Sequence, residues 1–218
     1  MDVTEAVYAR KSIRAFLDTP VDDTDIADLL TKAARAPSGG NVQPWRVYVI
    51  GTDTMPAFKE YLAEREIEKP GYAVYPENLW EPYRTNRFEL GEAMYATLGI
   101  GRDDKSARFA RLAENFNFFG APAALFCFVD DRMGPPQWSD LGMFLQTLML
   151  LAQEAGLDTC PQEAWASWSE AVASFVGAPD EEMLFCGVAI GHADPDAPVN
   201  SLESERMPLD AWATFVER

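Results

Sequence analysis

Two uninterrupted apolar segments constrain the fold of this chain more than any other feature. Residues 123–129 read AALFCFV and residues 183–190 read MLFCGVAI, and neither contains a charged residue. Short apolar runs without polar alternation are typical of strands that are buried on both faces. Because several predicted helices precede and separate these two segments, we expect a sheet with helices packed against both of its sides.

Most of the remaining chain predicts helices, because apolar residues recur at positions i, i+3 and i+4. The longest buried helix is expected over residues 138–155, where Leu141, Leu145 and Leu148 share one face. A further strand is expected over residues 46–50 and a loop over 69–78. The other expected helices cover residues 2–11, 23–36, 55–68, 79–100, 103–115 and 169–176.

The chain becomes polar and rich in proline after Gly191. Residues 194–210 read DPDAPVNSLESERMPLD, and such a segment cannot form a core alone. The rest of the chain contains no internal repeat or low-complexity linker. We therefore expect a single domain over residues 1–218, in which residues 192–218 form an extended C-terminal arm.

The composition is that of a globular protein, and its charge excludes two classes of partner. Hydrophobic residues make up 48% of the 218 residues and charged residues 24%, which is ordinary globular usage. The formal net charge of -17 disfavours nucleic acid and anionic membrane surfaces, because both bind clustered Lys and Arg. No window reaches about 18 uninterrupted apolar residues, and the opening residues, MDVTEAVYARKSIR, lack the apolar run of a secretory signal. We therefore expect no membrane segment.

Cysteine and histidine are scarce, which limits the chemistry available to side chains. Cys127, Cys160 and Cys186 stand apart without a C-x-x-C pair, and such a sparse, odd set predicts a reduced, cytoplasmic protein. His192 is the one histidine in the sequence, so a zinc site is hard to build and no metal site is expected. A Ser–His or Cys–His mechanism would have to use His192.

Positive charge is relatively concentrated near the N-terminus. Residues 1–50 hold six Lys and Arg against seven Asp and Glu, whereas the other 168 residues hold 12 against 28. Three of the cations, Arg10, Lys11 and Arg14, fall within five positions. One interpretation is a surface helix end, where cations suit the helix dipole. The other is an anion site, because Arg10, Ser12 and Arg14 can point the same way and arginine forks bind phosphate bidentately.

Three further segments contain candidate ligand-binding residues. APSGGNVQPW, over residues 36–45, is compatible with a simple helix stop and turn, but its small residues permit close approach and its amides supply donors and acceptors. CPQEAW, over residues 160–165, could deliver backbone N–H groups into a cleft, with Glu163 as a weaker candidate for a general acid. Residues 200–209 contain Arg206, which belongs to a solvated tail, an ion pair or a remote phosphate site.

Together these four segments resemble the nitroreductase family of FMN-dependent oxidoreductases over nearly the whole chain. The resemblance rests on RKSIRAF near the N-terminus, APSGGNVQPWRVYVI further along, GLDTCPQEAWA after the long helix and GHADPDAPVNSLESERMPL at the end. It implies an α+β sandwich with a central, mostly antiparallel sheet covered by helices. It also implies an obligate homodimer with FMN at the interface and a C-terminal arm that crosses to the partner subunit.

By the same resemblance, residues from all four segments bind FMN. Arg10 and Ser12 would lie near its phosphate, and Arg206 would close on that phosphate from the arm. Arg14 would lie nearer the ribityl chain or the pyrimidine edge. The flavin held mainly by the other subunit would be contacted by Pro37, Ser38, Gly39, Asn41 and Gln43. The isoalloxazine would be lined by Pro161, Gln162, Glu163 and Ala164, with a backbone N–H of Glu163 or Ala164 facing the central redox nitrogen.

Two positions depart from the pattern of the family. Many relatives carry a second cation two residues before the arm arginine, where this chain has Ser204. The grip on the phosphate is therefore expected to be weaker, or to depend more on Arg10. Many relatives also have glycine at the position of Ala164.

The resemblance implies an enzyme that passes two electrons from NADH or NADPH to a nitroaromatic or quinone acceptor in a ping-pong cycle. It points most closely to a nitrobenzoate-reductase-like branch. Because FMN would carry the electrons, no side chain is expected to act as a catalytic group. Arg84 and Arg87 share a helix face and could receive a carboxylate or the phosphates of the dinucleotide. The candidates for the acceptor pocket, which are alternatively core or interface residues, are Tyr72, Tyr75, Trp80, Tyr83, Arg84, Arg87 and Phe119.

Other functions remain compatible with parts of the pattern. A reductive dehalogenase would turn over a halotyrosine aerobically, and a flavin-destroying enzyme would accumulate a benzimidazole from reduced FMN. A non-catalytic flavin-binding redox module would be yellow without steady consumption of NADH or NADPH. A hydrolase based on His192 is disfavoured, because the sequence has no G-x-S-x-G motif.

Overall fold

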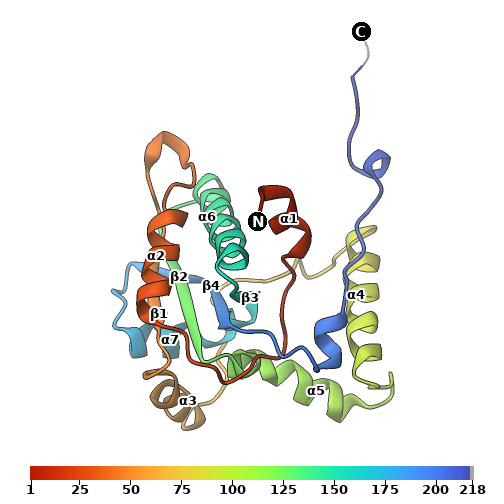
Figure 1. Ribbon diagram of the computed structural model, residues 1–218, viewed down its shortest axis with the longest axis horizontal. Helices are drawn as coiled ribbons and strands as arrows, with labels where there is room; N and C mark the ends of the chain where they lie inside the picture. Colours follow the sequence, from red (N-terminus) through yellow and green to blue (C-terminus); the bar gives the residue numbers. More distant parts are fainter. Residues whose placement is uncertain (217–218) are drawn as a thin grey trace.

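Four antiparallel strands form the central sheet of the structure, a computed structural model that describes residues 1–216 (Figure 1). In spatial order the strands are β1 (Arg46–Ile50), β2 (Ala123–Asp130), β4 (Glu182–Gly191) and β3 (Asp158–Gln162). Every neighbouring pair runs antiparallel. The α+β class and the antiparallel sheet expected from the sequence are therefore confirmed.

Side chains of β2 alternate between two hydrophobic cores, one on each face of the sheet. Leu125 and Cys127 point into one core, whereas Phe126 and Phe128 point into the other, and all four are completely buried. Because water reaches neither face of this strand, each face needs apolar side chains. The uninterrupted apolar sequence of β2 is the direct consequence.

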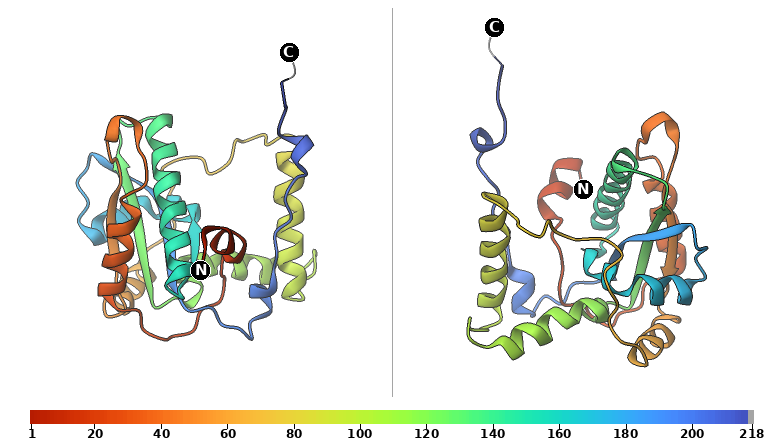
Figure 2. Two further views of the ribbon diagram at one scale, coloured as in Figure 1. Left: turned by 45° about the horizontal axis from the view of Figure 1, so that its top comes forward. Right: turned by 180° about the vertical axis from the view of Figure 1, so that it is seen from behind.

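Two helices cover each face of the sheet. α2 (Asp23–Ala33) and α6 (Pro135–Glu154) enclose the core on one face. α3 (Met55–Ala63) and α7 (Ser169–Val176) enclose the core on the other face, where Phe58 is fully buried. Figures 1 and 2 show these helices flanking the sheet on its two sides.

The remaining helices lie to one side of the sheet. α1 (Val3–Ala9) stands between the sheet and a separate group formed by α4 (Tyr83–Thr97), α5 (Lys105–Ala113) and the C-terminal arm (Figure 1). Both views in Figure 2 show the arm running alongside α4. The amide nitrogen of Asn86 on α4 lies 3.1 Å from the sulfur of Met207 in the arm. The later part of the described arm therefore packs on α4, whereas its first residues stay beside the sheet, where the N–H of Ala193 donates to Asp158 Oδ2 of β3 over 2.9 Å.

Some element boundaries differ from the sequence expectations. The chain after Gly156 forms a full strand, β3, paired along its length with β4, where the sequence indicated only an extended step. The helix expected over residues 55–68 ends at Ala63. The chain then turns so that the Glu68 carboxylate accepts hydrogen bonds of 2.8 Å from two N–H groups in the first turn of α7. A helix N-terminus needs such acceptors, so α7 uses a carboxylate that local sequence assigned to another helix.

The helix expected over residues 79–100 begins only at Tyr83 and ends at Thr97. Pro82 immediately precedes the first residue of this helix. Proline has no N–H group to leave without a partner, so it favours the start of a helix. Residues 79–81 instead line a surface cavity. Within residues 1–216, none of the helices is both long enough and apolar enough to cross a membrane.

Candidate functional site

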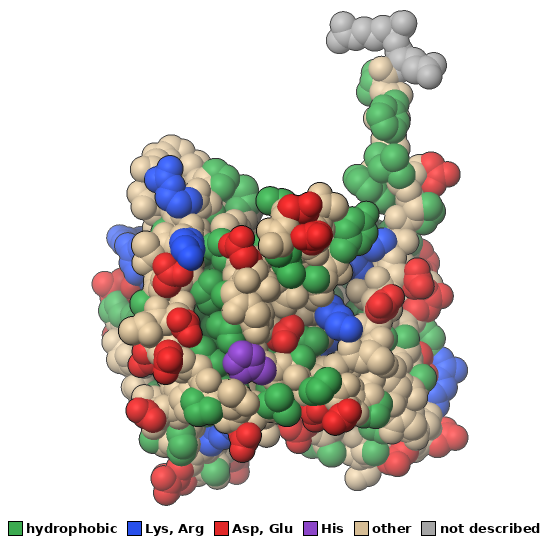
Figure 3. Space-filling model, viewed as in Figure 1, with side chains coloured by type: hydrophobic (Ala, Val, Ile, Leu, Met, Phe, Trp, Pro, Cys, Tyr) green, Lys and Arg blue, Asp and Glu red, His purple; other side chains and the backbone are tan. Residues whose placement is uncertain are grey.

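Four of the predicted cofactor residues line one cavity of about 1050 Å³. Arg10, Ser12 and Arg14 come from the segment after α1, and Arg206 comes from the C-terminal arm. The opposite wall includes Arg87 from α4. In Figure 3, lysine and arginine side chains lie beside the hollow between the body and the arm, on a surface where carboxylates are more numerous. The tertiary structure thus gathers cations from both ends of the chain.

The end of α1 sets the position of Arg10. Asp2 and Glu5 form a reciprocal capping box at the start of this helix, with hydrogen bonds of 2.8 Å. Arg10 leaves the helix in an extended conformation, and the chain then runs beside β3. The N–H of Ile13 donates to the carbonyl of Thr159 over 3.0 Å. The side chains on either side of the buried Ile13 are therefore presented to the cavity.

Two residues that sequence reasoning did not single out hold the backbone at Arg14. Asn200 Oδ1 accepts from the N–H of Arg14 over 2.9 Å, and Asn200 Nδ2 donates to the carbonyl of Ala15 over 2.8 Å. Arg111 Nη2 donates to the carbonyl of Arg14 over 2.8 Å. Both contacts join residues that are far apart in the sequence. Because they are long-range, no local motif could have identified them.

The cations of the cavity lack carboxylate partners within residues 1–216. None of the three arginines Arg10, Arg14 and Arg206 forms an ion pair within these described residues. Burial, and then the like charge of Arg206, lower the pKa of the Arg10 guanidinium below its ordinary value. Two facing cations with unused donors form a site that an anion stabilises. The donor set fits the phosphate monoester of FMN.

Ser204 orients the arginine of the arm. Arg206 Nη1 donates to Ser204 Oγ over 2.6 Å and to the carbonyl of Ser204 over 2.8 Å. By the resemblance, a second cation was expected at position 204. Ser204 instead accepts hydrogen bonds from the guanidinium of Arg206. The other nitrogens of the Arg206 guanidinium have no hydrogen-bond partner within residues 1–216.

The predicted loop from Pro37 to Gln43 does not line the cavity. Its backbone is fixed by the buried carboxylate of Asp140 on α6, which accepts from the N–H of Gly39 over 3.2 Å. The hydroxyl of Ser38 accepts from the N–H of Gln43 over 3.0 Å. Both Asn41 and Gln43 have positive φ and exposed side chains. The loop is thus an ordered surface of the single chain, with its amides turned to solvent.

The predicted segment Pro161–Ala164 also lies outside the cavity lining. The side chain of Gln162 is buried and is held internally, with Nε2 donating to the carbonyl of Asn115 over 2.8 Å. Glu163 and Ala164 begin a short 3₁₀ helix, Glu163–Trp168, that has no side-chain cap. The first N–H groups of a helix have no partner within it. The backbone of Glu163 and Ala164 can therefore donate to another group.

The structure separates the acceptor candidates into core residues and surface residues. Phe119 is 6% exposed and belongs to the core beneath α3 and α7. The hydroxyl of Tyr72 donates to the carbonyl of Phe185, and burial raises the pKa of this phenol well above its usual range. These two residues are structural. Tyr75, Trp80 and Tyr83 are each about half exposed, at 48%, 59% and 52%.

The two candidate arginines of α4 differ in their partners. Arg84 Nε donates to Glu81 Oε1 over 2.8 Å, in an ion pair near the start of the helix. Arg87 forms no ion pair within residues 1–216. Its guanidinium lies over the ring of Tyr75, 4.2 Å from the ring centroid. The charge of Arg87 is therefore oriented without being neutralised.

Comparisons with known proteins find relatives over the whole length of the chain. A model of the nitroreductase family matches residues 7–192. A 4-nitrobenzoate reductase from Pseudomonas putida is 34% identical over 99% of this chain and 96% of its own length, and a nitrobenzene nitroreductase from Ectopseudomonas oleovorans is 36% identical over 98% and 96%. The crystal structure of an FMN and NADPH-dependent nitroreductase, NfnB from Sphigopyxis sp. strain HMH, matches all of both chains at 44% identity with a TM-score of 0.96. From these matches and the fold that they share, the chain belongs to the nitroreductase family.

Proposed function

We propose that this protein is an FMN-dependent oxidoreductase that transfers two electrons from NADH or NADPH to a nitroaromatic or quinone acceptor in a ping-pong cycle. The observation that carries the proposal is the convergence of Arg10, Arg14 and Arg206 on one cavity, with no carboxylate partner within residues 1–216. The names of the relatives support it, because they describe nitroaromatic reduction and dependence on FMN and NADPH.

The cavity residues would hold the cofactor, whose own chemistry is hydride transfer between the nicotinamide and the acceptor. Arg10 and Arg206 would bind the phosphate with charge-assisted hydrogen bonds. The Ser12 hydroxyl would add a neutral donor to the same group. Arg14 would face the ribityl chain or the pyrimidine edge, from a backbone that Asn200 holds in place.

The segment after β3 would meet the flavin ring. Pro161, Glu163 and Ala164 would line it, and Gln162 would do so through its backbone, because its side chain is already hydrogen-bonded in the core. A free N–H of Glu163 or Ala164 would stabilise negative charge that develops on the ring. No side chain in this segment has to transfer a proton.

The active form would be a homodimer of single-domain subunits. The chain has an accessible surface of 13086 Å². A folded monomer of 24.3 kDa is expected to expose roughly 10,000 Å². The excess is of the size that an obligate interface buries, and α1 and the arm expose large apolar side chains such as Tyr8 and Trp212. The arm would then cross to the partner subunit.

In that dimer, the exposed loop after α2 would complete the site of the other subunit. Its small residues and exposed amide side chains suit contact with a flat ring. The residues expected to make this contact are Pro37, Ser38, Gly39, Asn41 and Gln43. The protein would work in the cytoplasm, as its free, buried cysteines suggest.

The first experiment is a visible spectrum of the purified protein, followed by NADPH and NADH oxidation assays. We expect a yellow holoprotein that consumes either dinucleotide when nitrobenzene, 4-nitrobenzoate or a quinone is added. A ping-pong cycle predicts parallel lines in double-reciprocal plots over several acceptor concentrations. The apoprotein serves as the control, because it should be inactive until FMN is restored.

Two results would contradict the proposal in different ways. A preparation that remains colourless after incubation with FMN would remove the cofactor assignment. A yellow protein without steady oxidation of NADPH or NADH across nitro compounds and quinones would instead indicate a non-catalytic flavin-binding module.

A further inference from the structure

Arg111, near the end of α5, is a half-buried cation with few partners. Its Nη2 donates to the carbonyl of Arg14 over 2.8 Å, which is the one hydrogen bond of this side chain within residues 1–216. Its Nε is buried and has no hydrogen-bond partner in the described part of the chain. The guanidinium lies over the ring of Phe119, 4.9 Å from the ring centroid. A buried donor without an acceptor costs stability, so the presence of this arginine needs a reason other than stability.

The charge of Arg111 is not neutralised by its surroundings. Arg111 forms no ion pair within the described residues. Burial lowers the pKa of its guanidinium, although the attraction of Glu114 partly opposes this effect, and Glu114 also attracts Lys59 on α3. Burial raises the pKa of the neighbouring Cys160 thiol to about 11, so this thiol is neutral near pH 7. The side chain of Glu163 near Cys160 is exposed, and water screens its charge.

The end of α5 joins two of the segments that are expected to hold the cofactor. Arg111 holds the segment after α1 through the carbonyl of Arg14. One turn later, the carbonyl of Asn115 accepts from Gln162 Nε2 over 2.8 Å, and Gln162 is the last residue of β3. The hydrogen bonds of Arg111 and Asn115 therefore constrain where these two segments lie relative to each other.

We propose that Arg111 is a positioning residue of the cofactor site and that its charge favours the reduced cofactor over the oxidised one. This inference rests on the proposed function and deepens it, because it names a residue that tunes the reducing power of the site. A hydride from the nicotinamide brings two electrons and one proton to FMN, so the ring gains one negative charge. A cation without a counterion in a partly buried site stabilises this charge more than it stabilises the neutral oxidised ring, and it can do so without touching the ring.

The test compares how tightly the wild type and Arg111→Gln bind the two redox forms of FMN. Anaerobic titration of the apoprotein with oxidised and with reduced FMN gives both dissociation constants, and electrochemical titration of the holoprotein gives the midpoint potential. We expect the Kd for reduced FMN to rise about tenfold more than the Kd for oxidised FMN, which is the effect of one pKa unit of differential interaction. For a two-electron couple, this change lowers the midpoint potential by about 30 mV.

A purely structural role of Arg111 predicts a different result. Loss of the bond to Arg14 alone would weaken the binding of both redox forms by the same factor, and an unchanged ratio of the two Kd values in Arg111→Gln would overturn the inference. Arg111→Lys keeps the charge without the guanidinium fork, so its ratio should stay within about threefold of the wild type even where both affinities fall. A tenfold rise of the ratio in Arg111→Lys would contradict the role of the charge. If Arg111→Gln does not fold, Arg111→Met replaces it, because a methionine packs on Phe119 without a charge.

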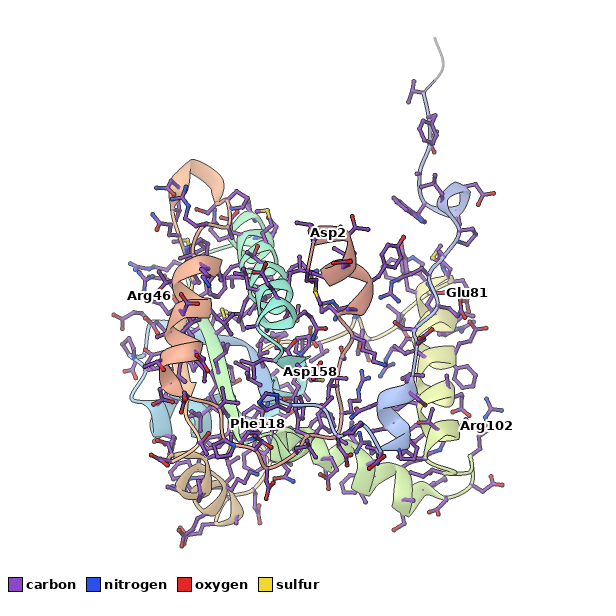
Figure 4. All side chains as sticks on the ribbon, in the orientation of Figure 1. Asp2, Arg46, Glu81, Arg102, Phe118 and Asp158 are labelled. Atoms are coloured by element: carbon purple, nitrogen blue, oxygen red, sulfur yellow. The ribbon has the colours of Figure 1, made fainter. Side chains whose placement is uncertain are left out.

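Arg102→Gln is the matched control. Arg102 also lies over an aromatic ring, that of Phe88 on α4, at 4.8 Å. It pairs with Glu92 over 3.0 Å, and its side chain is 65% exposed. Figure 4 labels Arg102 at the outer side of the group formed by α4 and α5, away from Asp158 of β3. Because this charge is paired, exposed and remote, both dissociation constants should stay within about threefold of the wild type.

The outcomes distinguish this inference from the proposed function. If the wild type is yellow and oxidises NADPH or NADH, but the ratio is unchanged in Arg111→Gln, the inference is wrong and the proposed function stands. If the ratio rises as expected, but the wild type oxidises neither dinucleotide steadily with any acceptor, the inference stands and the proposed function fails. A wild type that binds neither form of FMN overturns both.

Discussion

The Arg10 guanidinium is half-buried and faces the like charge of Arg206, so it lacks the full hydration and the counterion that a surface arginine has. Such a charge is stabilised most when an anion enters the site. The charge of Arg10 therefore raises the free energy of the cavity without an anion and lowers it when an anion is bound. At the scale of single residues, this is the main physical reason to assign the cavity to a phosphate.

Removing either arginine should weaken FMN binding. Each of Arg10→Ala and Arg206→Ala removes a charge-assisted contact of roughly 1.5–3 kcal/mol, so the Kd for FMN should rise by about 10- to 100-fold. Titrating the apoprotein with FMN and following the quenching of its fluorescence measures this. Arg132→Ala is the control, because Arg132 is largely exposed and pairs with Asp130 on another surface. Unchanged affinity in both cavity variants would refute the phosphate assignment.

Among the elements, the link between the C-terminal arm and the segment after α1 matters most for the site. Asn200 is 8% exposed and bonds the backbone of that segment as well as the carbonyl of Asp194. Arg206 follows six positions later in the same arm. One buried amide therefore sets the distance between two groups of cations that are nearly 200 residues apart in the sequence.

Asn200→Ala should lower both stability and cofactor affinity. It leaves the part-buried N–H of Arg14 without its partner and removes one of the two donors to the carbonyl of Ala15, which keeps the N–H of Asp194; the loss costs about 1–3 kcal/mol of the free energy of unfolding. Urea unfolding of the apoprotein measures the first effect, and FMN titration measures the second. Ser201→Ala is the matched control, since its exposed hydroxyl bonds only to Pro198 in the same turn. If Asn200→Ala loses stability but binds FMN normally, the hydrogen bonds of Asn200 stabilise the fold without positioning the cofactor residues.

The helices and strands also show where local sequence is sufficient to predict the bounds of an element. The strand over residues 46–50 and the helix over 169–176 have the expected bounds, because apolar periodicity and turn residues agree there. Glu68 was expected at the end of a helix, but it caps α7 across the sequence. Tertiary contacts of this kind outweigh helix propensity, which is worth less than about 1 kcal/mol per residue.

On the scale of the whole molecule, the main feature is the exposed apolar surface of α1 and the C-terminal arm. Tyr8 on α1 is 86% exposed, and Trp212 and Phe215 in the arm are 67% and 82% exposed. Figure 1 shows the last described residues of the arm, up to residue 216, projecting away from the helices and the sheet. A single subunit leaves this apolar surface in water, and a second copy would bury it.

We therefore expect the holoprotein to sediment as a dimer at micromolar concentration. Tyr8→Glu places a charge on the exposed face of α1 and should shift the equilibrium toward monomer, because burying an unpaired carboxylate costs several kcal/mol. Ile67→Glu is the control, since Ile67 is 62% exposed in the loop after α3. A wild-type holoprotein that sediments as a monomer would contradict the dimer.

The sequence by itself determined the sheet with two buried faces, the long α6 and the identity of the arginines near each end. These follow from periodicity and residue type, which act over a few positions. Only the tertiary structure decided that Arg10 faces Arg206 and that Asn200 and Arg111 hold Arg14. It also decided that, within residues 1–216, Arg84 forms an ion pair and Arg87 does not. The reason is physical: an ion pair or a hydrogen bond depends on separation in space, and chain distance constrains that separation only within a few residues.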